Sequence, residues 1–216
     1  MFWYHDELDR LEDLKKELTY TPELAFYGSS SFNYWNELSC IFQHYKPVNL
    51  AFGGSTLAAC SWFFYKTFKG VKPKAIFLYA GDNDLGEGRH PEEVVLFFRT
   101  MLFQIRAEFG DIPVSFISIK PSPARWYLAG SIDYANKHIK SITKVDSNFH
   151  YINIYDVMLN DNGVPNPEYY LSDGLHLTSK GYQVWVDQIK KSKKSFPSNS
   201  SEEMVETGSC YVKRLS

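Results

Sequence analysis

Residues 24–31 read LAFYGSSS, a short apolar run that ends in a glycine and three serines. An apolar run of this length, closed by turn-forming residues, is typical of a buried strand. The same pattern returns as VNLAFGGS at residues 48–55 and as AIFLYAGD at residues 75–82. Together with two later apolar runs, these stretches predict five strands, at residues 24–27, 47–51, 75–79, 113–119 and 150–154.

Helical patterns separate the predicted strands. In the charged segment at residues 5–18, leucines recur every three or four residues, which indicates an amphipathic helix. Strands that are apolar on both faces and alternate with helices form a parallel sheet covered on both sides. The predicted fold class is α/β: a three-layer αβα sandwich with a five-stranded parallel, flavodoxin-like doubly wound sheet. The other predicted helices are residues 33–45, 55–68, 91–109, 125–144 and 178–191.

Length and composition agree with one globular domain. The 216 residues include 44% hydrophobic side chains, enough to enclose a large core. We therefore predict a folded domain over residues 1–191, which includes the N-terminal amphipathic helix. Residues 192–216 are rich in Ser, Lys and Glu, which predicts a polar tail that is mobile or that docks through Tyr211, Val212 and Leu215.

Charge and residue spacing exclude several kinds of partner. With 23 basic and 25 acidic residues, the formal net charge of −2 gives no bias toward nucleic acid or an anionic membrane. The three cysteines show no CxxC or zinc spacing, and Asp82, Asp84 and His90 match no standard metal site. No apolar run reaches the roughly 20 residues of a membrane span, and the charged N-terminal segment lacks the features of a signal peptide. We therefore expect a cytoplasmic protein with no cofactor, no metal, no nucleic-acid partner and no stable membrane insertion.

Polar motifs follow three of the predicted strands directly. Ser30 comes after the first strand, Gly54 after the second and Asn83 after the third. Because the carboxyl ends of parallel strands meet at one edge of a sheet, we expect these residues to converge there. A fourth motif, Asp173-Gly174-Leu175-His176, precedes the last helix and could reach over the same edge.

Each of the first three motifs has a chemical and a structural interpretation. Ser30 is a potential nucleophile whose backbone N–H could face an oxyanion, but a serine before a helix is also a common N-cap. Gly54 and Asn83 could donate a backbone N–H and a side-chain NH₂ to the same oxyanion, although both residue types are frequent in turns. Taken singly, the motifs favour the structural interpretation, whereas their joint occurrence favours acyl transfer.

Asp173 and His176 form the sharpest of the four signals. Side chains three residues apart on a tight turn can meet, so the carboxylate can orient one imidazole nitrogen while the other acts as a base. The alternative is an aspartate that caps a turn beside an unrelated histidine. With Ser30, this pair predicts a Ser-His-Asp triad.

These motifs resemble the sequence blocks of the SGNH (GDSL-type) hydrolase superfamily, which is named for its Ser, Gly, Asn and His. The matching stretches are FYGSSSFNYW, NLAFGGST, YAGDND and DGLHLTSKGY, and the resemblance spans residues 24–186. It implies an esterase or lipase-like enzyme with Ser30 as nucleophile, His176 as general base and Asp173 as its orienting partner. It also implies an oxyanion hole made by the backbone N–H groups of Ser30 and Gly54 and by the side chain of Asn83.

Ser29 stands where the first block of the superfamily usually has an aspartate, which is a supporting residue, so the departure weakens the motif match more than the mechanism. SIKPSPARW, at residues 118–126, resembles a feature of one branch of the superfamily, and the sequence assigns it no chemical role.

The predicted function is a serine esterase that hydrolyses short-chain acyl esters, in the first place acetyl esters, of a small-molecule substrate. No lid-like apolar insertion follows the motifs, which argues against long-chain lipids. Lysophospholipase or thioesterase activity, and a catalytically inactive binding protein with the same fold, are the alternatives. A flavodoxin-like cofactor binder would leave the Asp173–His176 motif unexplained. The side chains proposed to line the acyl or alcohol side are Trp35, Arg125, Trp126 and Tyr170.

Overall fold

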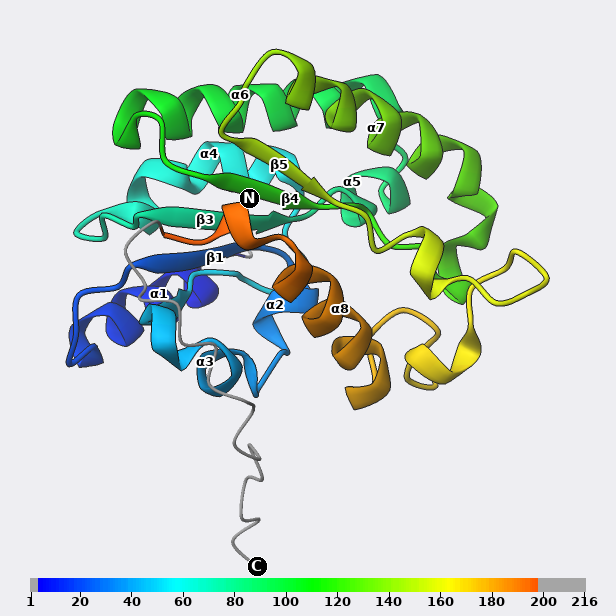
Figure 1. Cartoon of the computed structure of the whole chain (residues 1–216), viewed down its shortest axis with the longest axis horizontal. Helices are drawn as coiled ribbons and strands as arrows, with labels where there is room; N and C mark the ends of the chain where they lie inside the picture. Colours follow the sequence, from blue (N-terminus) through cyan, green and yellow to red (C-terminus); the bar gives the residue numbers. More distant parts are fainter. Residues whose placement is uncertain (1–3, 198–216) are drawn as a thin grey trace, which may run out of the picture.

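Five parallel strands form the sheet at the centre of the protein, in the order β2-β1-β3-β4-β5 (Figure 1). The computed structural model describes residues 4–197. This strand order is that of the flavodoxin-like doubly wound sheet, which confirms the predicted fold class. The strands are β1 (Leu24–Gly28), β2 (Pro47–Asn49), β3 (Ala75–Tyr79), β4 (Val114–Ile117) and β5 (Phe149–Ile152).

Helices cover both faces of the sheet and complete the three layers. Figure 1 shows α4, α6 and α7 along one face, whereas α2, α3 and α8 lie along the other. Each face has its own cluster of buried apolar side chains, and α1 contributes to the cluster beneath α4 and α6. The helices are α1 (His5–Glu17), α2 (Ser30–Asn33), α3 (Leu38–Ile41), α4 (Leu57–Phe68), α5 (Asp82–Gly86), α6 (Pro91–Phe109), α7 (Ala129–Ser141) and α8 (Ser179–Lys191).

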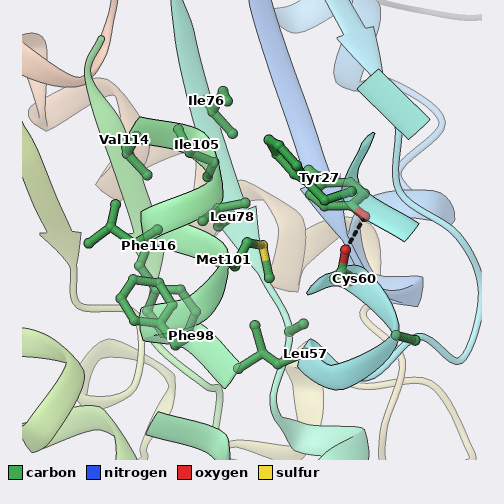
Figure 2. Packing of buried hydrophobic residues seen from close by; sticks show 14 of the residues in the cluster. Tyr27, Leu57, Cys60, Ile76, Leu78, Phe98, Met101, Ile105, Val114 and Phe116 are labelled. Carbon is green, nitrogen blue, oxygen red and sulfur yellow. Dashed lines mark hydrogen bonds between the residues drawn. The ribbon is translucent and has the colours of Figure 1, made fainter. Parts of the chain in front are cut away.

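Strands β1 and β3 at the centre of the sheet are apolar because they are buried on both faces. All five residues of β1 and of β3 are buried. Figure 2 shows how side chains of β3 and β4, such as Leu78 and Phe116, lie close to Phe98 and Met101 of α6. Burying one such side chain stabilises the fold by about 1.5–3 kcal/mol, so the sheet and its helical layers depend on each other.

The ends of β1 and β3 approach each other unusually closely. Gly28 ends β1 with a φ of +140°, and a Cβ at this position would lie 1.8 Å from the carbonyl oxygen of Tyr79. Only glycine fits such an approach. The N–H of Ser29 then donates to the same carbonyl oxygen at 2.8 Å. The chain leaves these two neighbouring strands toward opposite sides of the sheet, so this is the switch point of the topology, where ligands of doubly wound proteins usually bind.

The predicted helix at residues 33–45 is wrong. The segment begins at the last residue of α2 and then forms only the four-residue helix α3 and a 3₁₀ turn at Gln43–Tyr45. Asparagine and aromatic residues are weak helix formers, and the chain turns between two aromatic anchors. Trp35 stacks on Tyr182 with ring centroids 4.9 Å apart, and Phe42 packs on Phe26 at 5.1 Å. Tertiary packing therefore overrides the local pattern.

The predicted helix at residues 125–144 begins later than expected. Pro123–Leu128 form a 3₁₀ segment, and Arg125 within it is not helical, with φ −124° and ψ 24°. The α-helix α7 begins at Ala129 and is followed by a 3₁₀ turn at Ile142–Lys144. The short helix α5 was not predicted from sequence, because five residues are too few to show a helical period.

The chain beyond α8 first packs back on the sheet layer. Phe196 is only 8% exposed, and its ring stacks on that of Tyr45 with centroids 4.4 Å apart. Residues 198–216, and with them the suggested docking side chains Tyr211, Val212 and Leu215, lie outside the described residues. In the described part of the chain, no helix combines the length and the apolar character that crossing a bilayer requires.

Candidate active site

Asp173 and His176 are joined by a short side-chain hydrogen bond. The Nδ1 atom of His176 lies 2.6 Å from Oδ2 of Asp173. Oδ1 of the same carboxylate accepts the backbone N–H groups of Leu175, at 2.8 Å, and of His176, at 2.9 Å. Because a carboxylate only accepts, Nδ1 carries the hydrogen, so a neutral imidazole in this position has its lone pair on Nε2. The spacing of the two residues therefore produces the contact expected from the sequence.

These hydrogen bonds set the ionisation of Asp173. Burial acts to raise its pKa, but the hydrogen bonds from the His176 side chain and from the two backbone N–H groups outweigh it and lower the pKa to about 2. The carboxylate is therefore ionised at neutral pH. An ionised acceptor holds the imidazole in one tautomer and one orientation.

The loop that carries this pair reaches across to α2. The hydroxyl of Tyr182, at the start of α8, donates to the carbonyl oxygen of Ser31 at 3.0 Å. The ring of His176 lies beside that of Tyr34, with centroids 5.1 Å apart. Tyr34 follows α2 directly, so the two contacts bring the histidine next to the helix that Ser30 begins.

Ser30 is the first residue of α2 and is partly buried. Ser29 occupies the N-cap position, yet its side chain makes no capping hydrogen bond, so the cap interpretation does not explain this serine-rich turn. Within residues 4–197, no hydrogen bond joins the Ser30 hydroxyl to His176. Bonds of this kind are often long in a free enzyme and tighten only when substrate binds.

Gly54 lies at the surface, directly after Gly53, where a Cβ would lie 3.6 Å from Nδ2 of Asn33 at the end of α2. It is exposed and has a φ of +66°, a left-handed conformation that favours glycine. The next residue, Ser55, holds this turn against the end of β1, because its hydroxyl donates to the carbonyl oxygen of Gly28 at 2.8 Å. The second motif is thereby fixed to the first.

Asn83, near the start of α5, connects the third motif to the second. Its Nδ2 donates to the carbonyl oxygen of Ser55 at 3.0 Å, and its Oδ1 accepts from Arg125 at 3.0 Å. A carbonyl only accepts and a guanidinium only donates, so the two partners together fix which end of the amide is which. One N–H of the Asn83 amide has no acceptor among the described residues and can serve a ligand.

Three charged residues lie behind Asn83: Asp82, Arg125, which the sequence predicts to line the substrate, and Lys120, to which the sequence assigns no role. Lys120 is 2% exposed, and its Nζ lies 3.0 Å from Oδ2 of Asp82 and 3.1 Å from the hydroxyl of Tyr79. Arg125 also approaches Asp82, at 3.3 Å. Burial opposes the charge of Asp82, but Lys120 and Arg125 outweigh it and lower its pKa. Lys120 and Arg125 both belong to the SIKPSPARW stretch, which is the signal that could have pointed to Lys120.

Asp84, considered above as a metal ligand, has a different role. Its carboxylate is completely buried and accepts the backbone N–H groups of Leu57, at 2.7 Å, and Ala58, at 3.4 Å, at the start of α4. Burial raises the pKa of Asp84 to about 6. Within residues 4–197, no three His, Cys, Asp or Glu side chains are placed to hold a metal ion.

Two of the four side chains expected to line the substrate are core residues instead. Trp35 is buried between Tyr182 and Phe32. Tyr170 is also buried, and its hydroxyl donates to the carbonyl oxygen of Pro121. A position on a loop close to the motifs did not predict the location of these two side chains. Burying a large aromatic side chain in the core is more favourable than leaving it exposed on an open loop.

The sequence matches that of a known protein family. The sequence model of the GDSL-like Lipase/Acylhydrolase family matches residues 20–184, which include all four motifs. The chain belongs to this family. Membership in the GDSL-like family makes it an acylhydrolase in general terms and does not name its ester. A search of curated protein sequences finds no match.

Solved structures share the fold of this GDSL-like protein at low sequence identity. A GDSL-like lipase from Bacteroides thetaiotaomicron is 22% identical, with a TM-score of 0.72 over 85% of this chain and 95% of that one. A lipase/acylhydrolase from Enterococcus faecalis is 18% identical, with a TM-score of 0.65 over 81% and 96%. A carbohydrate esterase family 3 protein from Talaromyces cellulolyticus is 16% identical, with a TM-score of 0.59 over 79% and 95%. At these identities the likeness is one of fold.

Proposed function

We propose that the protein is a serine esterase that hydrolyses short-chain acyl esters, acetyl esters above all, of a small-molecule alcohol. Ser30 is the nucleophile, His176 the general base and Asp173 the residue that orients the base. The observation that carries this proposal is the 2.6 Å contact between an ionised Asp173 and His176 on a loop that lies against α2. Family membership supports the reaction class.

The first half of the reaction forms an acyl-enzyme. Nε2 of His176 accepts the hydroxyl proton of Ser30 as the serine oxygen attacks the ester carbonyl carbon. The tetrahedral intermediate then collapses, the bond to the alcohol oxygen breaks, and the imidazolium returns the proton to that oxygen. In the second half, His176 takes a proton from water as the water oxygen attacks the acyl carbon. The bond from that carbon to the Ser30 oxygen then breaks, the imidazolium returns the proton to Ser30, and the acid leaves.

Charge builds up on the carbonyl oxygen during both steps. The proposed donors to this oxyanion are the backbone N–H groups of Ser30 and Gly54 and the free N–H of the Asn83 side chain. Donors that are already fixed stabilise an oxyanion without a cost of reorientation, and each contributes about 10²–10³ in kcat. The two hydrogen bonds that hold the Asn83 amide support its inclusion.

A short acyl group fits what surrounds these residues. Trp35 and Tyr170, the aromatic side chains that could have lined a long acyl channel, are packed in the core. The Asn83 side of the site carries charged partners, which favours a polar substrate over a long hydrocarbon chain. The carbohydrate esterase with the same fold suggests sugar esters as the first substrates to assay.

Hydrolysis of p-nitrophenyl acetate by the wild type, the Ser30→Ala variant and a Ser39→Ala control tests the proposal. Ser39 is an exposed serine on α3 and takes no part in the proposed mechanism. We expect kcat to fall by about 10⁵–10⁶ in Ser30→Ala, the size of loss known from serine proteases, and to stay unchanged in the control. Equal activity in Ser30→Ala and the wild type would overturn the assignment of the nucleophile.

A set of further substrates and one label separates the alternatives. We expect rates to fall from acetate to butyrate to octanoate esters, whereas a lysophospholipase would show the reverse order and a thioesterase would prefer acyl thioesters. An organophosphonate should add its mass to the wild type and not to Ser30→Ala. A wild type that is neither labelled nor active would instead be a binding protein.

A further inference from the structure

The SIKPSPARW stretch has no part in the mechanism given so far, yet it lies against both halves of the site. We propose that Arg125 is a positioning residue that fixes the Asn83 amide with its NH₂ toward the oxyanion, and that the Lys120–Asp82 pair anchors Arg125. This inference rests on the proposed function and adds to it the residues that prepare the third oxyanion donor.

The contact between Arg125 and Asn83 determines the orientation of the amide. Rotation of the amide by 180° would place its NH₂ against the guanidinium and its oxygen against the carbonyl of Ser55. The first contact would then join two hydrogen-bond donors and the second two acceptors. The amide oxygen would also repel the developing oxyanion. With Arg125 in place, the observed bonds at 3.0 Å to each partner hold the productive orientation.

Arg125 is itself held from several sides. Its guanidinium lies against Gly86 so closely that a Cβ at position 86 would approach it to 2.9 Å. Its NH1 reaches both Asn83 and the carboxylate of Asp82, and its side chain is only 19% exposed. A planar guanidinium packed in this way loses little further freedom when it donates.

The positive charge of Lys120 and Arg125 should stabilise the oxyanion, as the orientation of the Asn83 amide does. Two cations, Lys120 and Arg125, share the single carboxylate of Asp82, so the cluster carries one net positive charge. The cluster lies largely out of water, where charges interact more strongly than they do in solvent. A positive charge behind the oxyanion donor favours the negative charge of the transition state over the neutral ester.

The same stretch also contacts the loop that carries the base. The N–H of Ala124 donates to the carbonyl oxygen of Gly174 at 3.1 Å, between Asp173 and His176. A Cβ at Gly174 would lie 3.3 Å from the N atom of Ala124, so a larger residue there would press on the stretch. Residues 118–126 therefore set the spacing between the oxyanion donor and the base.

The test measures kcat and KM for acetyl ester hydrolysis in Arg125→Ala, Arg125→Lys and Asn83→Ala, and in the double variant of Arg125→Ala with Asn83→Ala. Arg106→Ala is the matched control, because Arg106 is also an ion-paired arginine with an 18% exposed side chain, at the far end of α6. Thermal unfolding of each variant confirms that it is folded. Arg125→Lys keeps the positive charge but lacks the planar set of N–H donors that the guanidinium provides.

We expect Arg125→Ala to lower kcat by about 10- to 100-fold with little change in KM, less than the roughly 10²–10³ for removal of the whole donor. Arg125→Lys should recover part of this loss. In the Asn83→Ala background the Arg125→Ala change should lower kcat by less than about threefold, because the two residues act as one unit. A purely structural role would lower kcat by the same factor in both backgrounds.

The outcomes separate the two proposals. An active wild type whose kcat is unaffected by Arg125→Ala, or equally affected with and without Asn83, overturns this inference and leaves the esterase in place. A wild type with no Ser30-dependent hydrolysis overturns the proposed function and this inference with it. Loss of kcat in Arg106→Ala equal to that in Arg125→Ala would also overturn the inference.

Discussion

The loop of Asp173 and His176 and the carboxamide of Asn83 both adjoin the stretch that follows β4, but different contacts hold them. Asp173 receives its hydrogen bonds from residues two and three positions further along the chain. Asn83 is held by Ser55 and Arg125, which are 28 and 42 positions away. The base is thus oriented by a local turn, and the oxyanion donor by the assembled sheet edge.

This difference also appears in burial and charge. The side chain of Asp173 is 47% exposed and forms one side-chain hydrogen bond, with His176 three residues further along. Behind Asn83, by contrast, Lys120 and Asp82 form a buried ion pair with exposed fractions of 2% and 7%. A buried pair stabilises only if its geometry is kept, because each charge has lost its hydration. Substitution in the local half should therefore change the unfolding free energy little, whereas substitution in the long-range half should lower it measurably.

Asp173→Asn should have the largest effect in this comparison. An amide in place of the carboxylate can donate to Nδ1 and so favour the wrong tautomer of His176, which in serine proteases lowers kcat by about 10⁴. Because the side chain is exposed and its contacts are local, the melting temperature should change little. Steady-state kinetics with thermal unfolding checks both expectations, and a variant with near wild-type kcat would show that the base needs no orienting carboxylate.

Asn83→Ala should come second, with kcat lower by about 10²–10³ and KM nearly unchanged. The substitution also leaves Arg125 and the carbonyl of Ser55 without their partner, so we expect a loss of stability as well. Measuring kcat, KM and urea unfolding in one preparation separates the two effects. Unchanged kcat would remove Asn83 from the mechanism.

The smallest expected effect is on the pH dependence of stability, and it compares the buried Asp84 with the exposed Asp173. Asp84 supports α4, which follows Ser55, and its pKa is raised to about 6, whereas that of Asp173 is lowered to about 2. A raised pKa means that the folded state favours the protonated form, so this contribution is present below pH 3.8 and is lost as the pH rises through 6.

Asp84→Asn should remove this contribution. Between pH 4 and pH 6.5, the unfolding free energy of the wild type should fall relative to that of the variant, by up to about 3 kcal/mol. Urea unfolding of both proteins at several pH values measures the difference. Parallel pH profiles would show that Asp84 is ionised in the folded state over this whole range.

Local sequence was enough to predict most of the strands and helices. Apolar runs such as residues 24–27 and 75–79 predicted strands that the structure confirms, because strands buried on both faces must be apolar throughout. The helix expected at residues 33–45 failed because Trp35 and Phe42 each find a separate partner, which requires a turn between them. Whether that turn exists depends on Tyr182 and Phe26, which are distant in sequence.

The sequence alone determined the α/β sheet, the edge at which the motifs gather and the pairing of Asp173 with His176. These features depend on short-range patterns: apolar runs, glycines at strand ends, and a spacing of three residues on a turn. The tertiary structure alone decided that Arg125 and Lys120 lie behind Asn83, and that Trp35 and Tyr170 belong to the core. Those contacts join residues that become neighbours only when separate strands and helices pack, so no local pattern encodes them.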